Sequence, residues 1–102
     1  MEVQIHSDFL LLVAVRKRLH RSRTAMFEDI RAGLLPPTII IGGRLRALPA
    51  DEVEKIAQAR AAGCSQEEIR RLVAALVARR TANRLKLLQA LNADQEGCGD
   101  GT

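Results

Sequence analysis

Arginine side chains are the groups through which this chain could act on a partner. The sequence has 16 Lys and Arg residues against 12 Asp and Glu, for a net charge of +4, and 13 of the 16 cations are arginine. A guanidinium group donates paired hydrogen bonds to phosphate oxygens and to the edge of guanine. The excess of arginine therefore indicates a polyanionic partner.

The cations fall in two blocks. Residues 16–46 have a balance of +6 and residues 69–86 again +6 without any acid, whereas residues 50–68 have a balance of −3. We expect the first block to contact the partner and the second to be a solvated surface. The chain has two Phe but no Trp or Tyr, which argues against single-stranded nucleic acid, because its bases stack on aromatic side chains.

Residues of metal-binding type are few. Cys64 and Cys98 lie far apart in a basic chain and are expected to be two free thiols. His6 and His20 lack the spacing of a metal pair and are expected at the surface. We therefore expect no metal and no cofactor.

Catalysis is also not expected. The Gly42-Gly43 pair is not followed by the Lys-Ser/Thr of a phosphate loop, and the sequence shows no nucleophile paired with a base. A chain of 102 residues buries one core without a deep cleft between domains, which disfavours enzymes with large substrates. The apolar run over residues 9–15 is too short to cross a bilayer, so we expect a cytoplasmic protein without membrane contact.

Two short helices are predicted to present the first cationic block. Residues 9–12 form either a short strand or the start of a helix that continues to Leu19. Ser22 is a suitable N-cap for a second helix over residues 23–32, which Gly33 closes. This spacing is typical of a helix-turn-helix. The expected inward side chains of the second helix and its end are Met26, Phe27, Ile30 and Leu34.

A β-hairpin is predicted after Pro36-Pro37. Three isoleucines, a Gly42-Gly43 turn in which both glycines supply positive φ, and a returning Arg44-Leu45-Arg46 segment indicate a two-residue loop. Arg44 and Arg46 are expected to alternate onto one face of the returning strand.

Two further helices are predicted. The Asp51-x-x-Glu54 spacing indicates a capping box for a helix to about residue 62, and Ser65-x-x-Glu68 indicates another for the longest helix, which meets no Gly or Pro before Leu91. The apolar stripe of the longest helix is Ile69, Leu72, Val73, Leu76 and Val77, and a shifted group follows at Leu85, Leu87, Leu88 and Leu91. This second group either faces solvent or contacts another subunit.

The expected fold is mostly α with a small β-hairpin. Its units are a winged helix-turn-helix over residues 1–63, a C-terminal helix over residues 64–92 that packs on it and associates with other copies, and a disordered tail over residues 93–102.

Residues 11–77 resemble the AlpA-like prophage regulators, relatives of excisionases and of the MerR-type DNA-binding domain. The segments that carry the resemblance are Ser22-Arg23-Thr24, Ile30-Arg31-Ala32-Gly33, Leu35-Pro36-Pro37, Ile39-Ile40-Ile41-Gly42-Gly43-Arg44 and Asp51-Glu52-Val53-Glu54. The resemblance implies a regulator of an integrated mobile element that binds double-stranded DNA at an attachment site or promoter. It also implies action on transcription, on excision with an integrase of the tyrosine recombinase class, or on both.

The resemblance assigns the candidate contacts. Ser22 and Thr24 would donate to phosphate, Arg23 and Arg31 would reach the major groove or its phosphates, and Arg44 with Arg46 would place the wing in the minor groove. Glu28 and Asp29 are expected to point outward, where a carboxylate either reads cytosine or lies farther from DNA. The full expected DNA-binding set is Arg21, Ser22, Arg23, Thr24, Glu28, Arg31, Gly43, Arg44 and Arg46.

A module of this size contacts few base pairs. We therefore expect several copies to bind side by side on DNA. Head-to-tail contact through Leu85, Leu87, Leu88 and Leu91 is the favoured arrangement, with a homodimer through the same helix as the alternative. A protein-binding adaptor or antitoxin-like module that docks through the long helix is the alternative function.

Overall fold

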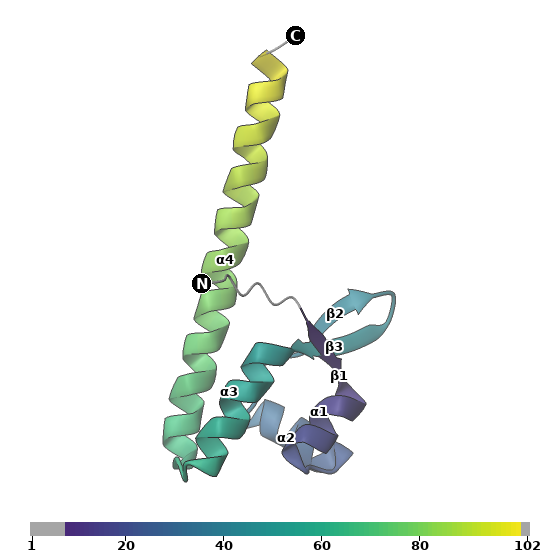
Figure 1. Cartoon of the computed structure of the whole chain (residues 1–102), viewed down its shortest axis with the longest axis vertical. Coiled ribbons are helices and arrows are strands. Elements are labelled where there is room, and N and C mark those ends of the chain that lie inside the picture. The colour runs from purple at the N-terminus through teal and green to yellow at the C-terminus, as the bar shows by residue number, and fades with distance from the viewer. Residues whose placement is uncertain (1–7, 101–102) are drawn as a thin grey trace.

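The protein is mostly helical, with a small antiparallel sheet and one long C-terminal helix. The computed structural model describes residues 8–100, with side chains to residue 93, so His6 and the rest of residues 1–7, the side chain of Cys98 and residues 101–102 lie outside the description. The elements are β1 (Phe9–Leu11), α1 (Leu12–Leu19), α2 (Arg23–Arg31), β2 (Ile39–Gly42), β3 (Leu45–Pro49), α3 (Ala50–Ala61) and α4 (Gln66–Asp100). Figure 1 shows α4 beside α3 and continuing well beyond the other elements.

One hydrophobic core joins these elements. It contains Val15 and Leu19 of α1, Met26 of α2, Leu34 and Leu35 of the following loop, Leu48 of β3, Val53 and Ile56 of α3, and Ile69, Val73 and Leu76 of α4. Phe27, Ile30, Leu72 and Val77 pack against it while partly buried. The predicted inward faces of α2 and of the first half of α4 are therefore confirmed. None of the described helices is long and apolar enough to span a membrane.

The sheet has the strand order β1-β3-β2. Residues 9–12 were expected to form either a short strand or the start of a helix. Phe9–Leu11 is a strand that pairs with β3, and the helix begins at Leu12. The hairpin turn lies one residue later than predicted. Gly42 pairs with Leu45, so Gly43 and Arg44 form the two-residue loop, and Arg44 lies in the turn and not on the strand.

Of the two glycines in the hairpin, only Gly43 has positive φ, at +54°, so the expectation that both do was wrong. Gly42 is extended and its added Cβ would meet no atom within 4 Å. A turn with positive φ at its first central residue needs one glycine there, and that residue is Gly43.

We therefore expect Gly43→Val to lower the free energy of unfolding by at least about 1 kcal/mol, because a β-branched residue resists the left-handed region. Gly42→Val, the matched control, should change it by less than about 0.5 kcal/mol. Urea titration followed by far-UV circular dichroism measures both, with near-normal helix content expected in each variant. Equal losses at the two positions would contradict the assigned turn.

The helix starts show one correct and one wrong prediction. The Ser65–Glu68 capping box is confirmed, because Ser65 N donates to Glu68 Oε1 at 2.8 Å and Glu68 N donates to Ser65 Oγ at 3.2 Å. The Asp51–Glu54 box is wrong, because α3 begins at Ala50 after Pro49 without a side-chain cap. The strand runs directly into this helix, and the carbonyl of Asp8 accepts from Ala50 N at 2.9 Å.

The long helix extends farther than predicted. The expected tail from residue 93 starts inside α4, which continues to Asp100. Glycine lowers helix propensity but keeps its backbone N–H, so Gly97 does not end the helix as proline would. Beyond Arg80 every described side chain of α4 is exposed, including Leu85, Leu87, Leu88 and Leu91.

Candidate nucleic-acid interface

Helix α2 presents a polar outward stripe. Thr24, Glu28 and Arg31 follow the i, i+4, i+7 spacing of one helical face, and all three are exposed. Arg23, one residue before Thr24, is also exposed and lies 5.6 Å from the centroid of the Phe27 ring, in cation–π geometry. At the start of the helix, Ser22 Oγ accepts from Ala25 N at 3.1 Å, which confirms its N-cap role.

Asp29 does not belong to this stripe. The expectation that it points outward was wrong, because the residue is only 4% exposed. Arg21 Nε and Nη2 donate to its two carboxylate oxygens at 2.9 and 3.0 Å, and Arg60 of α3 adds a contact at 3.5 Å. A carboxylate can be buried here because two guanidinium groups compensate its charge.

Arg21 is therefore engaged inside the protein. The hydrogen bond to Asp29 is the main reason that the pKa of Arg21 is raised above its ordinary value. This pair joins the turn after α1 to the inner face of α2 and, through Arg60, to α3. Arg21 thus positions the helix whose other face carries Thr24, Glu28 and Arg31.

The opposite end of α2 is held by α4. Arg70 Nε donates to the carbonyl of Ala32 at 2.9 Å, which satisfies a free carbonyl at the C-terminus of the helix. Gly33 follows with φ +81°, and its added Cβ would lie 3.8 Å from Arg70 Cγ. The second cationic block, expected to be only a solvated surface, thus supplies a structural contact.

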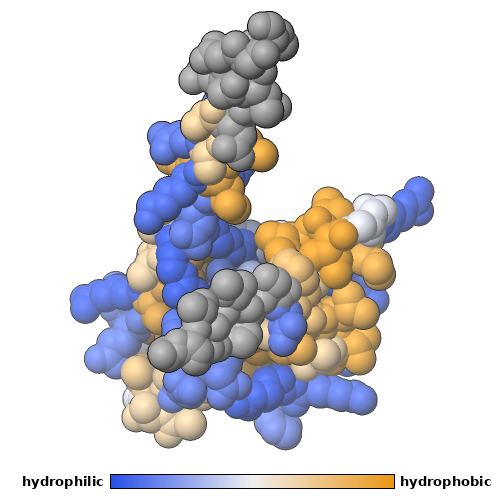
Figure 2. Space-filling view, turned by 45° about the horizontal axis from the view of Figure 1, so that its top comes forward, coloured by the Kyte–Doolittle hydropathy of each residue, from blue (hydrophilic) through white to orange (hydrophobic). Residues whose placement is uncertain are grey.

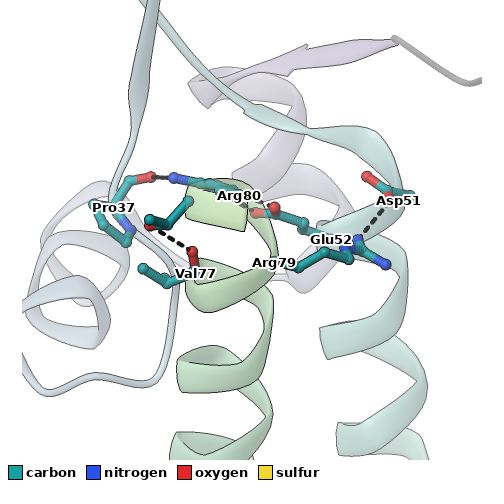
Figure 3. Close-up of polar contacts among 7 residues, drawn as sticks. Pro37, Asp51, Glu52, Val77, Arg79 and Arg80 are labelled. Carbon is teal, nitrogen blue, oxygen red and sulfur yellow. Dashed lines mark hydrogen bonds and ion pairs between the residues drawn. The ribbon is translucent and has the colours of Figure 1, made fainter. Parts of the chain in front are cut away.

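Arg80 of that block makes the most buried ion pair among the described residues. Its side chain is 22% exposed and that of Glu52 is 3% exposed, with Arg80 Nη2 to Glu52 Oε1 at 2.6 Å. Arg80 Nη1 also donates to the carbonyl of Pro37 at 2.9 Å. Figure 3 shows Arg80 between Pro37 and Glu52, while the neighbouring Arg79 reaches Asp51. Arg80 thus joins α3, α4 and the segment before β2.

Sequence reasoning missed this pair, although a helical pattern could have found it. Arg80 continues the apolar stripe of α4 in phase with Leu76, and Glu52 shares its helix face with Val53 and Ile56. A buried charge needs a partner of opposite sign, so an arginine and a glutamate on two inward helix faces are expected to form an ion pair.

The hairpin presents the other candidate cations. Arg44 is exposed in the turn, and Arg46 is exposed on β3, where its Nη1 donates to Thr38 Oγ1 at 3.1 Å. The hairpin projects to one side of the molecule, away from α4 (Figure 1). The candidate residues thus form two groups, one on α2 and one on the hairpin.

Cations of α1 adjoin the α2 group. One shallow depression is lined by Arg16 and Arg23, and a second by Arg16 and Lys17. Because Arg16 lines both, these three cations lie on one continuous surface.

Ion pairing divides the arginines. Among the described side chains, Arg18, Arg21, Arg60, Arg70, Arg71, Arg79 and Arg80 take part in ion pairs. No acidic side chain in that part of the chain pairs with the other six arginines, which are Arg16, Arg23, Arg31, Arg44, Arg46 and Arg84. Four of these six, Arg23, Arg31, Arg44 and Arg46, lie on α2 and the hairpin.

Comparison with known proteins gives no match among family models, curated proteins or solved structures.

Proposed function

We propose that this protein is a winged helix-turn-helix that binds double-stranded DNA. The observation that carries the proposal is the set of four arginines on α2 and the hairpin that make no ion pair among the described residues. Helix α2 enters the major groove, which has the width to admit a helix, and the hairpin is the wing in the adjacent minor groove. The contact of the buried Asp29 with Arg21 and the hydrogen bond from Arg70 to the carbonyl of Ala32 fix the orientation in which α2 reaches the bases.

Each group has a distinct role in this complex. Ser22 and Thr24 lie at the start of α2, where hydroxyl and backbone N–H groups donate to phosphate oxygens. Arg23 and Arg31 contact phosphates or guanine edges. Gly43 supports the turn that carries Arg44. Glu28, exposed between Thr24 and Arg31, accepts a hydrogen bond from cytosine N4.

The resemblance to AlpA-like regulators extends the proposal to a target. The DNA is the attachment site or promoter region of an integrated mobile element, and the protein acts in excision, in transcription or in both. An integrase of the tyrosine recombinase class is the corresponding protein partner in excision. A footprint on the attachment region and on the promoter of the element distinguishes the two roles.

The decisive experiment is a salt titration of DNA affinity. We expect the triple variant Arg23→Ala, Arg44→Ala, Arg46→Ala to lower the slope of log affinity against log salt by about three, since each phosphate contact contributes about one. An arginine that reads a base should instead cost roughly 1–3 kcal/mol at the preferred site and little at random sequence.

The matched control removes three exposed cations elsewhere, at Lys55, Arg71 and Lys86. This control variant loses the same net charge as the first triple variant. If direct contact with DNA and not overall charge determines the salt dependence, the control should leave the slope of log affinity against log salt nearly unchanged. Fluorescence anisotropy with a labelled duplex measures both variants. Unchanged binding by the first triple variant would refute the proposal.

A second candidate function is a protein-binding adaptor that docks through α4. The observation that favours it is the exposure of Leu85, Leu87, Leu88 and Leu91, which are between 44% and 67% exposed. Large exposed apolar residues in a cluster indicate a protein contact. Association of an adaptor would be insensitive to salt, whereas DNA binding would weaken steeply as salt is added.

A further inference from the structure

A groove lies between the sheet and α4. It has a volume of about 520 Å³ and is lined by Phe9, Ile39 and Pro49 from the sheet and by Leu87 and Leu88 from α4. Phe9 is 47%, Leu87 67% and Leu88 44% exposed, so both apolar walls are open to a further contact. Figure 2 shows apolar areas over the hairpin and on the projecting part of α4. A groove of this size suits a short peptide segment or a small ligand.

The charges in the groove leave one cation in excess. Arg79 pairs with Asp51 at 2.9 Å, and both residues line the groove. Arg80 pairs with Glu52 at 2.6 Å, and both of these line it as well. Arg84 also lines the groove, but it pairs with no acidic side chain between residues 8 and 93. An apolar occupant that carries a negative charge therefore fits this groove.

The chain enters β1 at the edge of the groove. Strand β1 is antiparallel to β3, and Phe9 pairs with Pro49 at the point where β3 runs into α3. The carbonyl of Asp8 accepts from Ala50 N at 2.9 Å. Because Phe9 and Pro49 both line the groove, residues 1–7 are covalently attached beside it.

The sequence before β1 has the pattern of an extended segment with one apolar side. Its apolar residues stand at odd positions, with Ser7 as the exception, and are Met1, Val3, Ile5 and Phe9. The residues at even positions are polar, and are Glu2, Gln4, His6 and Asp8. Side chains alternate between the two sides of an extended chain, so Val3 and Ile5 would share the side of Phe9, which lines the groove.

We propose that residues 1–7 bind in the groove of their own chain as an extended segment, with Val3 and Ile5 against its apolar walls. The length is sufficient, because seven extended residues reach about 23 Å. The α4 wall from Arg80 to Leu88 is about 12 Å long. Because the segment is tethered beside the groove, its effective concentration there is in the millimolar range.

Charge selects this occupant over a second copy of α4. Residues 1–7 contain one acid, Glu2, and neither Lys nor Arg, so Glu2 can compensate Arg84. Residues 81–93 of α4 contain Arg84 and Lys86 and no acid. A second copy of that helix segment would therefore add positive charge to a groove that already holds an unpaired arginine.

This contact goes beyond the proposed function, because it requires no DNA. It would join the sheet to the part of α4 that lies beyond Arg80, where every described side chain is exposed. A partner that docks on Leu87 and Leu88 would first have to displace residues 1–7. The segment would therefore compete with the partner of an adaptor.

Fluorescence quenching tests the contact, because the chain has no Trp of its own. Leu88→Trp places a single fluorophore on the α4 wall of the groove. We expect the added changes Val3→Asp and Ile5→Asp to raise its acrylamide quenching constant at least about twofold, since the indole loses its apolar cover. The matched control adds Gln4→Asp and His6→Asp, which place the same charges on the other side of the segment. This control should leave the quenching constant nearly unchanged.

A charge exchange tests the expected ion pair in the same reporter chain. Glu2→Lys should raise the quenching constant by a smaller factor, because exposed ion pairs contribute little. The further change Arg84→Glu should restore the original constant. Lys86→Glu is the matched control, since Lys86 does not line the groove, and it should not restore the constant although it changes the net charge equally.

Protein concentration distinguishes a contact within one chain from a contact between copies. The quenching constant should be the same from about 1 to about 100 µM protein, because an intramolecular contact does not depend on mass action. Far-UV circular dichroism checks that each variant keeps its helices. Equal rises for the two aspartate pairs, rescue by Lys86→Glu in place of Arg84→Glu, or a constant that falls as protein concentration rises would each overturn the proposal, whatever the result for DNA.

Discussion

Replacing Arg80 with alanine is expected to lower the free energy of unfolding by about 3–5 kcal/mol, because it leaves a buried carboxylate without its partner. Glu52 is only 2% exposed, and Arg80 is the partner that reaches it, with Nε at 3.0 Å and Nη2 at 2.6 Å from its oxygens. The same change also removes the hydrogen bond to the carbonyl of Pro37. Urea titration of the purified variant measures the loss.

The adjacent arginine supplies the control. Arg79 pairs with Asp51 at 2.9 Å, but both side chains are 44% exposed. Arg79→Ala should therefore cost less than about 1 kcal/mol, as exposed ion pairs do. The double variant Glu52→Met, Arg80→Met should recover much of the Arg80→Ala loss, since it leaves no charge buried. Similar losses for Arg79→Ala and Arg80→Ala would show that burial does not decide the strength of these pairs.

The two arginines on Asp29 are expected to act non-additively. Arg60→Ala removes a single 3.5 Å contact and should cost less than about 1 kcal/mol, while Arg21→Ala removes the paired hydrogen bonds and should cost about 1–3 kcal/mol. The double variant should lose more than the sum, approaching about 3–5 kcal/mol, because Asp29 then has neither guanidinium group. A double-mutant cycle in urea measures the coupling.

The Arg21→Ala variant also tests whether Arg21 positions α2 or contacts DNA itself. Because Arg21 is engaged with Asp29, Arg21→Ala should leave the salt slope of DNA binding unchanged while it lowers stability. Arg31→Ala is the control, since Arg31 is exposed at the end of the outward stripe and should reduce the slope by about one with little loss of stability. A reduced slope for Arg21→Ala would place Arg21 among the DNA contacts.

Local patterns in the sequence predicted most of the fold. The Ser65–Glu68 box and the Ser22 cap were correct, because a capping hydrogen bond joins residues three apart and depends little on the rest of the chain. The ends of the helices at Gly33 and near residue 62 were also predicted, because glycine readily adopts the left-handed conformation that ends a helix, as Gly33 and Gly63 do here. The hairpin was correct as an element and wrong by one residue in its turn.

Two of the errors concern charged residues whose position depends on partners outside their own helix. Asp29 looks like part of a solvated face within its own helix, but its buried carboxylate is compensated by Arg21 from the turn before the helix and by Arg60, 31 residues away. Asp51 has the spacing of a cap, yet Pro49 leads β3 directly into α3 and Asp51 pairs with Arg79 of α4 instead. Helical periodicity in the sequence predicts on which face of its helix a charged residue lies. The ion-pair partner of Asp51, in contrast, follows from how α3 and α4 pack against each other.

The residues that hold α2 in place are different from those that it exposes. Asp29, Met26 and the carbonyl of Ala32 face inward to their partners, whereas Thr24, Glu28 and Arg31 are exposed on the opposite stripe. Mutations in the stripe therefore carry little stability cost and escape selection for folding. Under the proposed function, descendants of this chain can therefore change the DNA sequence that they bind while they inherit the same scaffold.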